Sequence, residues 1–370
     1  MFLKRLSVLN FKNHEDTSMV LSQNINCFVG NNGSGKTNLL DAIHYLSFTK
    51  SYFNSQDAFN IKYEEPFLSV EGYFDKDGKQ ELVHCGIKRG TKKVMKRNKK
   101  SYVRMSDHIG LFPLVMVSPT DISLLLDGSE SRRKYLDSVI SQFDSLYLEK
   151  LIRHNKLIAQ RNAALKQMAR GSHFDLSTIE LYDQQIVPIA QKIFDVRKSF
   201  LQELTPIFYK YYQKITGKKR EEVSIIYKSQ LLDHDLSELF KENIARDQML
   251  QHTSVGIHKD DLSFQLDGYP IKKIGSQGQQ KTFLMALKLA QFDFMKEALG
   301  YKPMLLLDDV FDKLDDSRVE QLMILVDKHH FGQIFITDTH PERSAHIFNK
   351  IEADFKVFHI NQGKIEKKNE

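Results

Sequence analysis

Tryptophan is absent from this 370-residue chain, and cysteine and proline are scarce, with two and eight residues. Cys27 and Cys85 lie far apart, without a CxxC motif or histidines at zinc-ligand spacing, so buried thiols are expected rather than a disulfide framework or a metal site. Apolar runs such as Leu111 to Val117 reach only about seven residues, whereas a membrane-spanning helix needs roughly 20. Charged residues also interrupt the start of the chain, unlike a secretory signal. The sequence therefore predicts a cytoplasmic protein without a membrane-spanning segment.

Charge is nearly balanced overall but not locally. The 53 basic and 47 acidic residues leave a net charge of +6, and 41% hydrophobic with 27% charged residues is typical of a globular chain of two or three domains. Residues 76–104 carry a local net charge of +9, which leaves −3 for the rest. Alternating residues around Asp75–Lys79 predict a β-hairpin there. Its basic surface fits either a DNA phosphate backbone or a lysine-rich sheet edge that resists aggregation.

Glycine is also uncommon, with 18 residues, yet three glycines fall within the segment 30–37. This segment matches the P-loop pattern G-x-x-x-x-G-K-[ST], with a strand-like stretch before it and a helical pattern after it. Such a loop binds phosphates through backbone N–H groups at a helix N-terminus. We expect Lys36 to reach the β- and γ-phosphates and Thr37 to bind Mg²⁺. The candidate ATP-binding residues are Gly30, Asn31, Asn32, Gly33, Ser34, Gly35, Lys36 and Thr37.

Two adjacent acids follow a second apolar stretch, Pro303–Leu307. Buried carboxylates at the end of a strand are costly without a nearby cation. Asp308 is therefore the expected Mg²⁺ residue, together with Thr37, and Asp309 is expected to orient or deprotonate the attacking water. Lys36 and Asp309 are the candidate catalytic residues.

A further anion-binding helix start is predicted between these two motifs. Ser276, Gln277, Gly278 and Gln279 precede a strongly apolar helical stretch from Thr282. A serine at such a position caps a helix whose N-terminus favours anions. Capping alone explains the serine but not the whole Ser-Gln-Gly-Gln segment.

These segments resemble those of ABC/SMC-type ATPases, in which a signature sequence precedes the helix before the Walker B strand. Within that class they are most similar to the RecF family of bacterial recombination mediators. The matching segments occur in the family's order over nearly the whole chain: Val117–Asp121, Ser131–Asp137, Gln160–Asn162, Gly256–Asp261, Ser276–Gln280 and Leu305–Val310.

The resemblance implies a cytoplasmic DNA repair protein that binds ATP, Mg²⁺ and DNA, either duplex or at single/double-strand junctions. It implies RecO and RecR as partners in recombinase loading, and a weak, DNA-stimulated ATPase used as a conformational switch. It also implies an ATP-dependent homodimer. In that dimer, Ser276 and Gly278 of one subunit contact the γ-phosphate on the other subunit's P-loop, and Leu314–Asp315 lie at the same interface.

The chain departs from the wider ABC pattern at three places. Asp309 replaces the usual glutamate, as in the RecF group, and its shorter side chain suggests slow hydrolysis. Asp338 lies at the switch-histidine position, for which His340 and His258 are alternatives. Lys50–Asn54 lacks an arginine that many relatives carry there.

Helical periodicity dominates from about residue 130 to 247. One heptad pattern runs through Leu148, Leu151, Asn155, Ile158, Asn162, Leu165 and Ala169, and a second through Ile179, Ile186, Ile193, Phe200 and Ile207. Together they predict a short antiparallel coiled-coil-like hairpin. The expected fold is α/β: an ABC/SMC-like P-loop head with an antiparallel β subdomain and an inserted α-helical lobe. The expected boundaries are 1–128 and 248–370 for the two parts of the head and 129–247 for the lobe.

Two other function classes remain as alternatives. An ABC-type ATPase subunit of a transporter shares the P-loop, the signature and the paired acids, although the helical insertion and the Ser-Gln-Gly-Gln signature disfavour it. A P-loop nuclease needs another acidic cluster, for which no free stretch remains.

Overall fold

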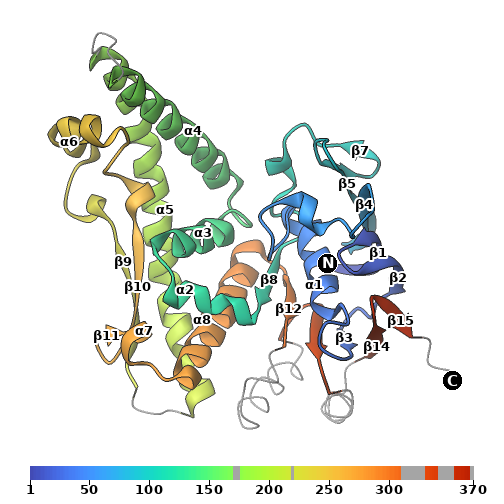
Figure 1. Ribbon diagram of the computed structural model, residues 1–370. Helices are drawn as coiled ribbons and strands as arrows, with labels where there is room; N and C mark the ends of the chain where they lie inside the picture. The colour runs from blue at the N-terminus through green and yellow to red at the C-terminus, as the bar shows by residue number, and fades with distance from the viewer. Residues whose placement is uncertain (170–175, 218–220, 310–329, 341–353, 367–370) are drawn as a thin grey trace. The chain divides into compact units, whose positions relative to one another are not determined.

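The computed structural model describes residues 1–169, 176–217, 221–309, 330–340 and 354–366 (Figure 1). It contains two compact units. Unit 1 comprises residues 1–121, 210–219 and 277–370, and unit 2 comprises residues 122–209 and 220–276. These bounds differ from the predicted domain boundaries. Residues 248–276 belong to unit 2 because strand β10 (Asp261–Leu266) pairs with β9 (Val223–Lys228).

Unit 1 contains a six-stranded sheet in the order β15-β14-β3-β13-β12-β8. All its pairings are parallel except that of β14 with β15. Its strands are β3 (Ile25–Val29), β8 (Leu114–Val117), β12 (Met304–Leu307), β13 (Ile334–Asp338), β14 (Phe355–Asn361) and β15 (Lys364–Glu366). The four strands β3, β8, β12 and β13 are fully buried, as expected for parallel strands that are covered on both faces.

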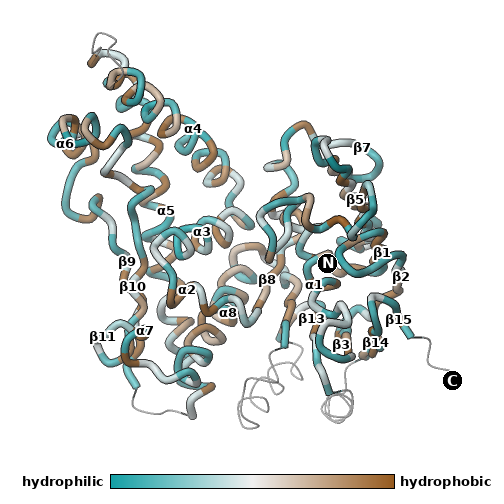
Figure 2. Tube along the Cα trace, in the orientation of Figure 1, coloured by the Kyte–Doolittle hydropathy of each residue, from teal (hydrophilic) through white to brown (hydrophobic). Residues whose placement is uncertain are grey.

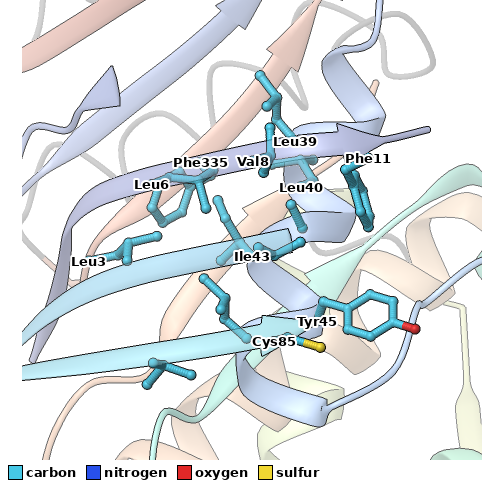
Figure 3. Close-up of a cluster of buried hydrophobic side chains, with 14 of the residues drawn as sticks. Leu3, Leu6, Val8, Phe11, Leu39, Leu40, Ile43, Tyr45, Cys85 and Phe335 are labelled. Atoms are coloured by element: carbon cyan, nitrogen blue, oxygen red, sulfur yellow. The ribbon is translucent and has the colours of Figure 1, made fainter. Parts of the chain in front are cut away.

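A second, antiparallel sheet of unit 1 has the order β2-β1-β4-β5-β6-β7. Its strands are β1 (Phe2–Phe11), β2 (His14–Val20), β4 (Phe67–Lys76), β5 (Lys79–Lys88), β6 (Val94–Arg97) and β7 (Lys100–Ser101). Helix α1 (Lys36–Phe48) contacts strands of both sheets. The apolar side chains of α1, including Leu39, Leu40 and Ile43, meet Leu6 and Phe335 in the core (Figure 3). The P-loop helix is thus held firmly between two sheets.

The predicted hairpin around Asp75–Lys79 is confirmed as β4 and β5, which are joined at Asp77 and Gly78. The chain around β7 is hydrophilic (Figure 2). Three basic residues of the segment 76–104 form ion pairs, Lys93 with Asp57, Arg97 with Glu81 and Arg104 with Asp107. Six other basic residues of this segment are exposed: Lys79, Lys88, Arg89, Lys92, Lys99 and Lys100. Only part of the local positive charge is therefore neutralised within the fold.

Unit 2 is mainly helical. Its helices are α2 (Ser123–Leu126), α3 (Ser129–Ile140), α4 (Ser145–Met168), α6 (Leu236–Leu250), α7 (Ile271–Ile274) and most of α5 (Leu176–Thr216). A three-stranded sheet, β11-β10-β9, completes it, with β11 at Tyr269–Pro270. Among the described residues, no helix is both long and apolar enough to cross a bilayer.

The heptad pattern predicted for α5 is confirmed at four positions, since Ile179, Ile186, Ile193 and Phe200 are buried. At the fifth position Phe208 is buried instead of Ile207, as the drift of a 3.6-residue turn against a seven-residue repeat requires. The seam predicted for α4 is confirmed at Leu165 but is wrong at Asn155. Asn155 is exposed, and the buried residues are Tyr147, His154, Leu157, Arg161 and Leu165.

The reason for that error is a buried guanidinium. Arg161 on α4 is fully buried and pairs with Asp183 on α5 and Asp247 on α6, each at 2.6 Å. Its head group also lies over the ring of Phe240, 4.7 Å from the centroid. Fully paired polar side chains can thus occupy an interior helix face that apolar spacing alone does not reveal.

A second buried arginine links other parts of unit 2. Arg197 on α5 pairs with Asp137 at 2.7 Å and Asp260 at 2.9 Å, and it donates to the carbonyl of Ile257 and the hydroxyl of Tyr147. Its side chain is 2% exposed. The Gly256–Asp261 segment is therefore fixed to α5 by charge-assisted hydrogen bonds.

Candidate nucleotide site

The P-loop connects the end of β3 to the start of α1. Gly35 has φ 115°, a left-handed conformation that favours glycine, and α1 begins at the next residue. The N–H groups of Lys36 and Thr37 belong to the first helical turn and are available to an anion. Lys36 is 4% exposed, and its Nζ donates to the carbonyls of Gly30 at 2.7 Å and Asn31 at 3.0 Å. The lysine thus lies folded across its own loop.

The structure brings together the two residues predicted to bind Mg²⁺. The Thr37 hydroxyl donates to Oδ1 of Asp308 at 2.7 Å, although the two residues are 271 positions apart. Burial raises the pKa of Asp308, and the hydrogen bonds from Thr37 and Thr337 oppose that shift. A cation near these oxygens would stabilise the ionised carboxylate further.

Sequence reasoning missed two hydroxyl residues at this carboxylate. Thr337 donates to Asp308 Oδ1 at 2.9 Å and accepts the backbone N–H of Asp309 at 2.8 Å. Ser118 lies 3.5 Å from Asp308 Oδ2. Strand register explains both contacts, because Leu307 is aligned with Val117 on one side and Ile336 on the other. Polar residues at the ends of neighbouring apolar strands were the available signal.

Asp309 and Asp338 stand at the edges of this carboxylate site. Asp309 has φ 46°, an uncommon left-handed conformation for a non-glycine residue. Asp338 pairs in register with Val29 next to the P-loop, is buried, and accepts the backbone N–H of His340 at 3.0 Å. His258 belongs to unit 2, where its Nε2 lies 3.1 Å from the carbonyl of Thr253. His258 therefore makes a local hydrogen-bond contact within its own turn.

The signature segment lies at a helix start, as predicted. Helix α8 (Gln277–Leu299) begins directly after Ser276, which is exposed, and Thr282 donates to the carbonyl of Gly278 at 2.9 Å. The segment Leu314–Asp315 lies outside the described residues.

The stretch Lys50–Asn54 takes part in a buried polar network that sequence reasoning did not find. Asp41 of α1 accepts the hydroxyl of Ser51 at 2.6 Å and the N–H of Tyr52 at 2.7 Å. The Tyr52 hydroxyl donates to Asp121, which also pairs with Lys288 of α8 at 2.8 Å. This network connects the P-loop helix to the signature helix within unit 1.

The residues of the site fit Mg²⁺ and a nucleotide phosphate group. Among the described residues, no three His, Cys, Asp or Glu side chains form a cluster that could hold a metal. One hydroxyl and one carboxylate are instead the donor set expected when phosphates and water complete the coordination of Mg²⁺. Within the described part of the chain, the buried Ser34 hydroxyl has no hydrogen-bond partner and could bind a phosphate oxygen.

Comparison with known proteins identifies the family. The family model described as "RecF/RecN/SMC N terminal domain" matches residues 2–366. The chain is 50% identical over 360 residues to the "DNA replication and repair protein RecF" of Flavobacterium johnsoniae, covering 97% of this chain and 100% of the relative. It is 49% identical to the protein of the same name from Bacteroides thetaiotaomicron, covering 99% of this chain and 98% of the relative.

Solved structures agree with this result. A structure of "the recombination mediator protein RecF-ATP in RecFOR pathway" matches with a TM-score of 0.88 and 29% identity, covering 99% of this chain and 97% of that one. An Smc head bound to the C-terminal winged-helix domain of ScpA matches with a TM-score of 0.59 at 15% identity, over 99% and 96% of the two chains, and thus shares the fold alone. The chain therefore belongs to the RecF family of DNA replication and repair proteins, with the α/β head and helical insertion of the RecF/SMC class.

Proposed function

We propose that this protein is an ATP-dependent DNA-binding switch of recombinational repair. The observation that carries the proposal is the contact between Thr37 and Asp308 next to the folded-back Lys36. This arrangement supports the proposal, because a hydroxyl, a carboxylate and a lysine ammonium group are the side-chain groups that bind Mg²⁺ and the phosphates in P-loop ATPases. The structure of a 29% identical relative is titled as a RecF–ATP complex, which supports ATP as the nucleotide.

Hydrolysis in this proposal uses Asp309. Thr37 and Asp308 would hold Mg²⁺, which would supply neutralisation of the negative charge that develops on the phosphates. When ATP binds, the Lys36 ammonium group replaces its hydrogen bonds to the carbonyls of Gly30 and Asn31 with contacts to the phosphates. Asp309 orients a water molecule and accepts its proton as the water attacks the γ-phosphorus. The bond between the γ-phosphorus and the oxygen of ADP breaks in the same step. Thr337 fixes the Asp309 backbone during this step. We expect turnover to be slow because an aspartate reaches less far toward the water than a glutamate.

A second copy of the chain completes the site. Ser276, Gln277, Gly278 and Gln279 at the start of α8 would contact the γ-phosphate held by the partner's P-loop, which produces an ATP-dependent dimer. The dimer would close on duplex DNA or a single/double-strand junction, and the exposed lysines near β7 would contact the phosphate backbone. RecO and RecR are the partners that we propose for recombinase loading, since the solved relative is described within the RecFOR pathway.

The Asp309→Asn variant tests this proposal. It retains the shape of the side chain but cannot accept the water proton. We expect ATP to bind, hydrolysis to fall by about two orders of magnitude or more, and dimers to accumulate with ATP in sedimentation velocity. Asp16→Asn changes an exposed aspartate on β2 and serves as the control. If this variant stays monomeric with ATP, the proposal that the signature segment of one subunit contacts the nucleotide of the other is contradicted.

DNA binding provides the second readout. We expect affinity for gapped duplex to be higher with ATP than with ADP or no nucleotide, and to fall steeply with salt. Lys36→Ala should abolish the ATP effect, whereas Lys4→Ala, at an exposed lysine, should not. Equal binding in all three nucleotide states would refute the proposed switch.

A further inference from the structure

The turn between β1 and β2 binds the outer side of the P-loop. The side-chain amide of Asn13 donates through Nδ2 to the carbonyl of Ser34 at 3.0 Å and lies 3.5 Å from the carbonyl of Gly33. Nε2 of the buried His14 lies 3.0 Å from the carbonyl of Gly35. Three consecutive carbonyls of the loop thus face two adjacent side chains from a different sheet.

The orientation of the Asn13 amide is fixed by the loop itself. The Ser34 carbonyl can only accept a hydrogen bond, so Nδ2 of Asn13 must face it. Oδ1 of Asn13 then accepts from Asn38, in the first turn of α1, at 2.8 Å. Asn13 therefore connects the loop to the helix that follows it.

The turn between β14 and β15 supports the loop from a third direction. The Gly363 N–H donates to the carbonyl of Ser34 at 2.8 Å, and the Gly363 carbonyl lies 2.8 Å from Nδ1 of His14. A Cβ at position 363 would lie 2.2 Å from the carbonyl oxygen of Asn13, so only glycine permits this approach. Burial lowers the pKa of His14 and so favours its neutral ring, which carries one N–H. His14 therefore donates to one of these two carbonyls and lies between the P-loop and the hairpin of β14 and β15.

We propose that Asn13 and His14 are positioning residues that hold the P-loop in its phosphate-binding conformation. The reason is the planarity of the peptide unit, in which C=O and the following N–H point in opposite directions. When the carbonyls of Ser34 and Gly35 are bound on the outside, the N–H groups that follow them, those of Gly35 and Lys36, are directed to the opposite, phosphate side. Neither Asn13 nor His14 needs to touch the nucleotide. This inference rests on the proposed function of the loop as an ATP site.

The test compares Asn13→Ala and Asn13→Asp. Aspartate has the same shape as asparagine and still accepts from Asn38, but it cannot donate to the loop carbonyls. If Asn13 positions the loop, both variants should weaken ADP and ATP binding alike, by about fivefold to tenfold for one lost hydrogen bond and more strongly for aspartate. The turnover rate at saturating ATP should change little, because Thr37, Asp308 and Asp309 are untouched. Gln23→Ala, at an exposed residue just before β3, is the control.

Amide hydrogen exchange in the absence of nucleotide separates this inference from the proposed function. Exchange in a peptide covering residues 30–40 should become faster in both variants, with no change in the unfolding midpoint of the whole protein. Wild-type exchange together with wild-type ADP affinity in Asn13→Asp would overturn the positioning role. If the unmodified protein bound no nucleotide while exchange still increased in the variants, the proposed function would be wrong and the positioning of the loop would stand.

Discussion

The two compact units are stabilised in different ways. In unit 1 a cluster of apolar side chains packs against the P-loop helix, and its Leu39, Leu40 and Ile43 are fully buried between the two sheets. In unit 2 the largest fully buried side chains include two arginines, Arg161 and Arg197, each paired with two aspartates. Apolar burial is non-directional, whereas a buried guanidinium is tolerated only with its partners in defined geometry. The apolar core around α1 therefore depends on volume, and the buried arginines of unit 2 depend on hydrogen-bond geometry.

The largest effect is expected from Arg197→Met in unit 2. The change removes the charge while retaining an apolar stem, and it leaves the 2% exposed Asp260 without its ion-pair partner. We expect a loss of about 3–5 kcal/mol in the free energy of unfolding of unit 2, measured by native-state hydrogen exchange of α5 peptides. Lys192→Met, at an exposed position of the same helix, is the control. A loss under about 1 kcal/mol, the usual value of an exposed ion pair, would contradict the geometric account.

A smaller effect is expected in the apolar core of unit 1. Ile43→Ala removes buried carbon atoms and should cost about 2–5 kcal/mol, whereas Ile43→Val should cost about 1 kcal/mol. The graded series is the signature of volume-dependent stabilisation, and hydrogen exchange of α1 peptides measures it. If both variants lost the same free energy of unfolding, the stability of this core would depend on geometry and not on the buried volume.

The smallest effect is expected from a fall in pH by one unit, which should lower the free energy of unfolding of both units alike. Burial lowers the pKa of His108 in unit 1 and of His154 in unit 2 from 6.5 to about 4. The folded protein therefore binds fewer protons than the unfolded chain between these values, so the stabilisation is complete above pH 6.5 and is lost as the pH falls toward 4. Each histidine should contribute about 1.4 kcal/mol per pH unit in that range.

Single substitutions check this pH dependence. His108→Gln can still donate to the carbonyl of Leu46, which lies 2.6 Å from Nε2, but does not titrate. It should reduce the pH dependence of unit 1 by the contribution of one group and leave that of unit 2 unchanged in urea unfolding followed by hydrogen exchange. The rest of the slope in unit 1 should remain, because burial also lowers the pKa of His44 to about 4. An unchanged slope in unit 1 would show that His108 does not contribute.

Several elements could be predicted because their signals are local. The P-loop, its strand and helix, and the β4–β5 hairpin follow from short segments whose spacing directly reflects backbone geometry. The α4 seam could not be predicted, because Arg161 looks like a surface residue until Asp183 and Asp247 are placed beside it. The predicted boundary between residues 247 and 248 differs from the bounds of the two compact units for a similar reason, since β10 pairs with a strand more than 30 residues earlier in the chain.

The sequence by itself determined the chemistry of the site: a lysine, a hydroxyl and two carboxylates in segments typical of a nucleotide-binding ATPase head. The tertiary structure decided which groups support that chemistry. Thr337 and Ser118 reach Asp308 only through strand register, and Asn13 and His14 reach the P-loop only because a hairpin of another sheet folds against it. A hydrogen bond depends on two atoms lying within about 3 Å of each other, and no local pattern along the chain specifies that distance for residues that lie 21 to 190 positions apart.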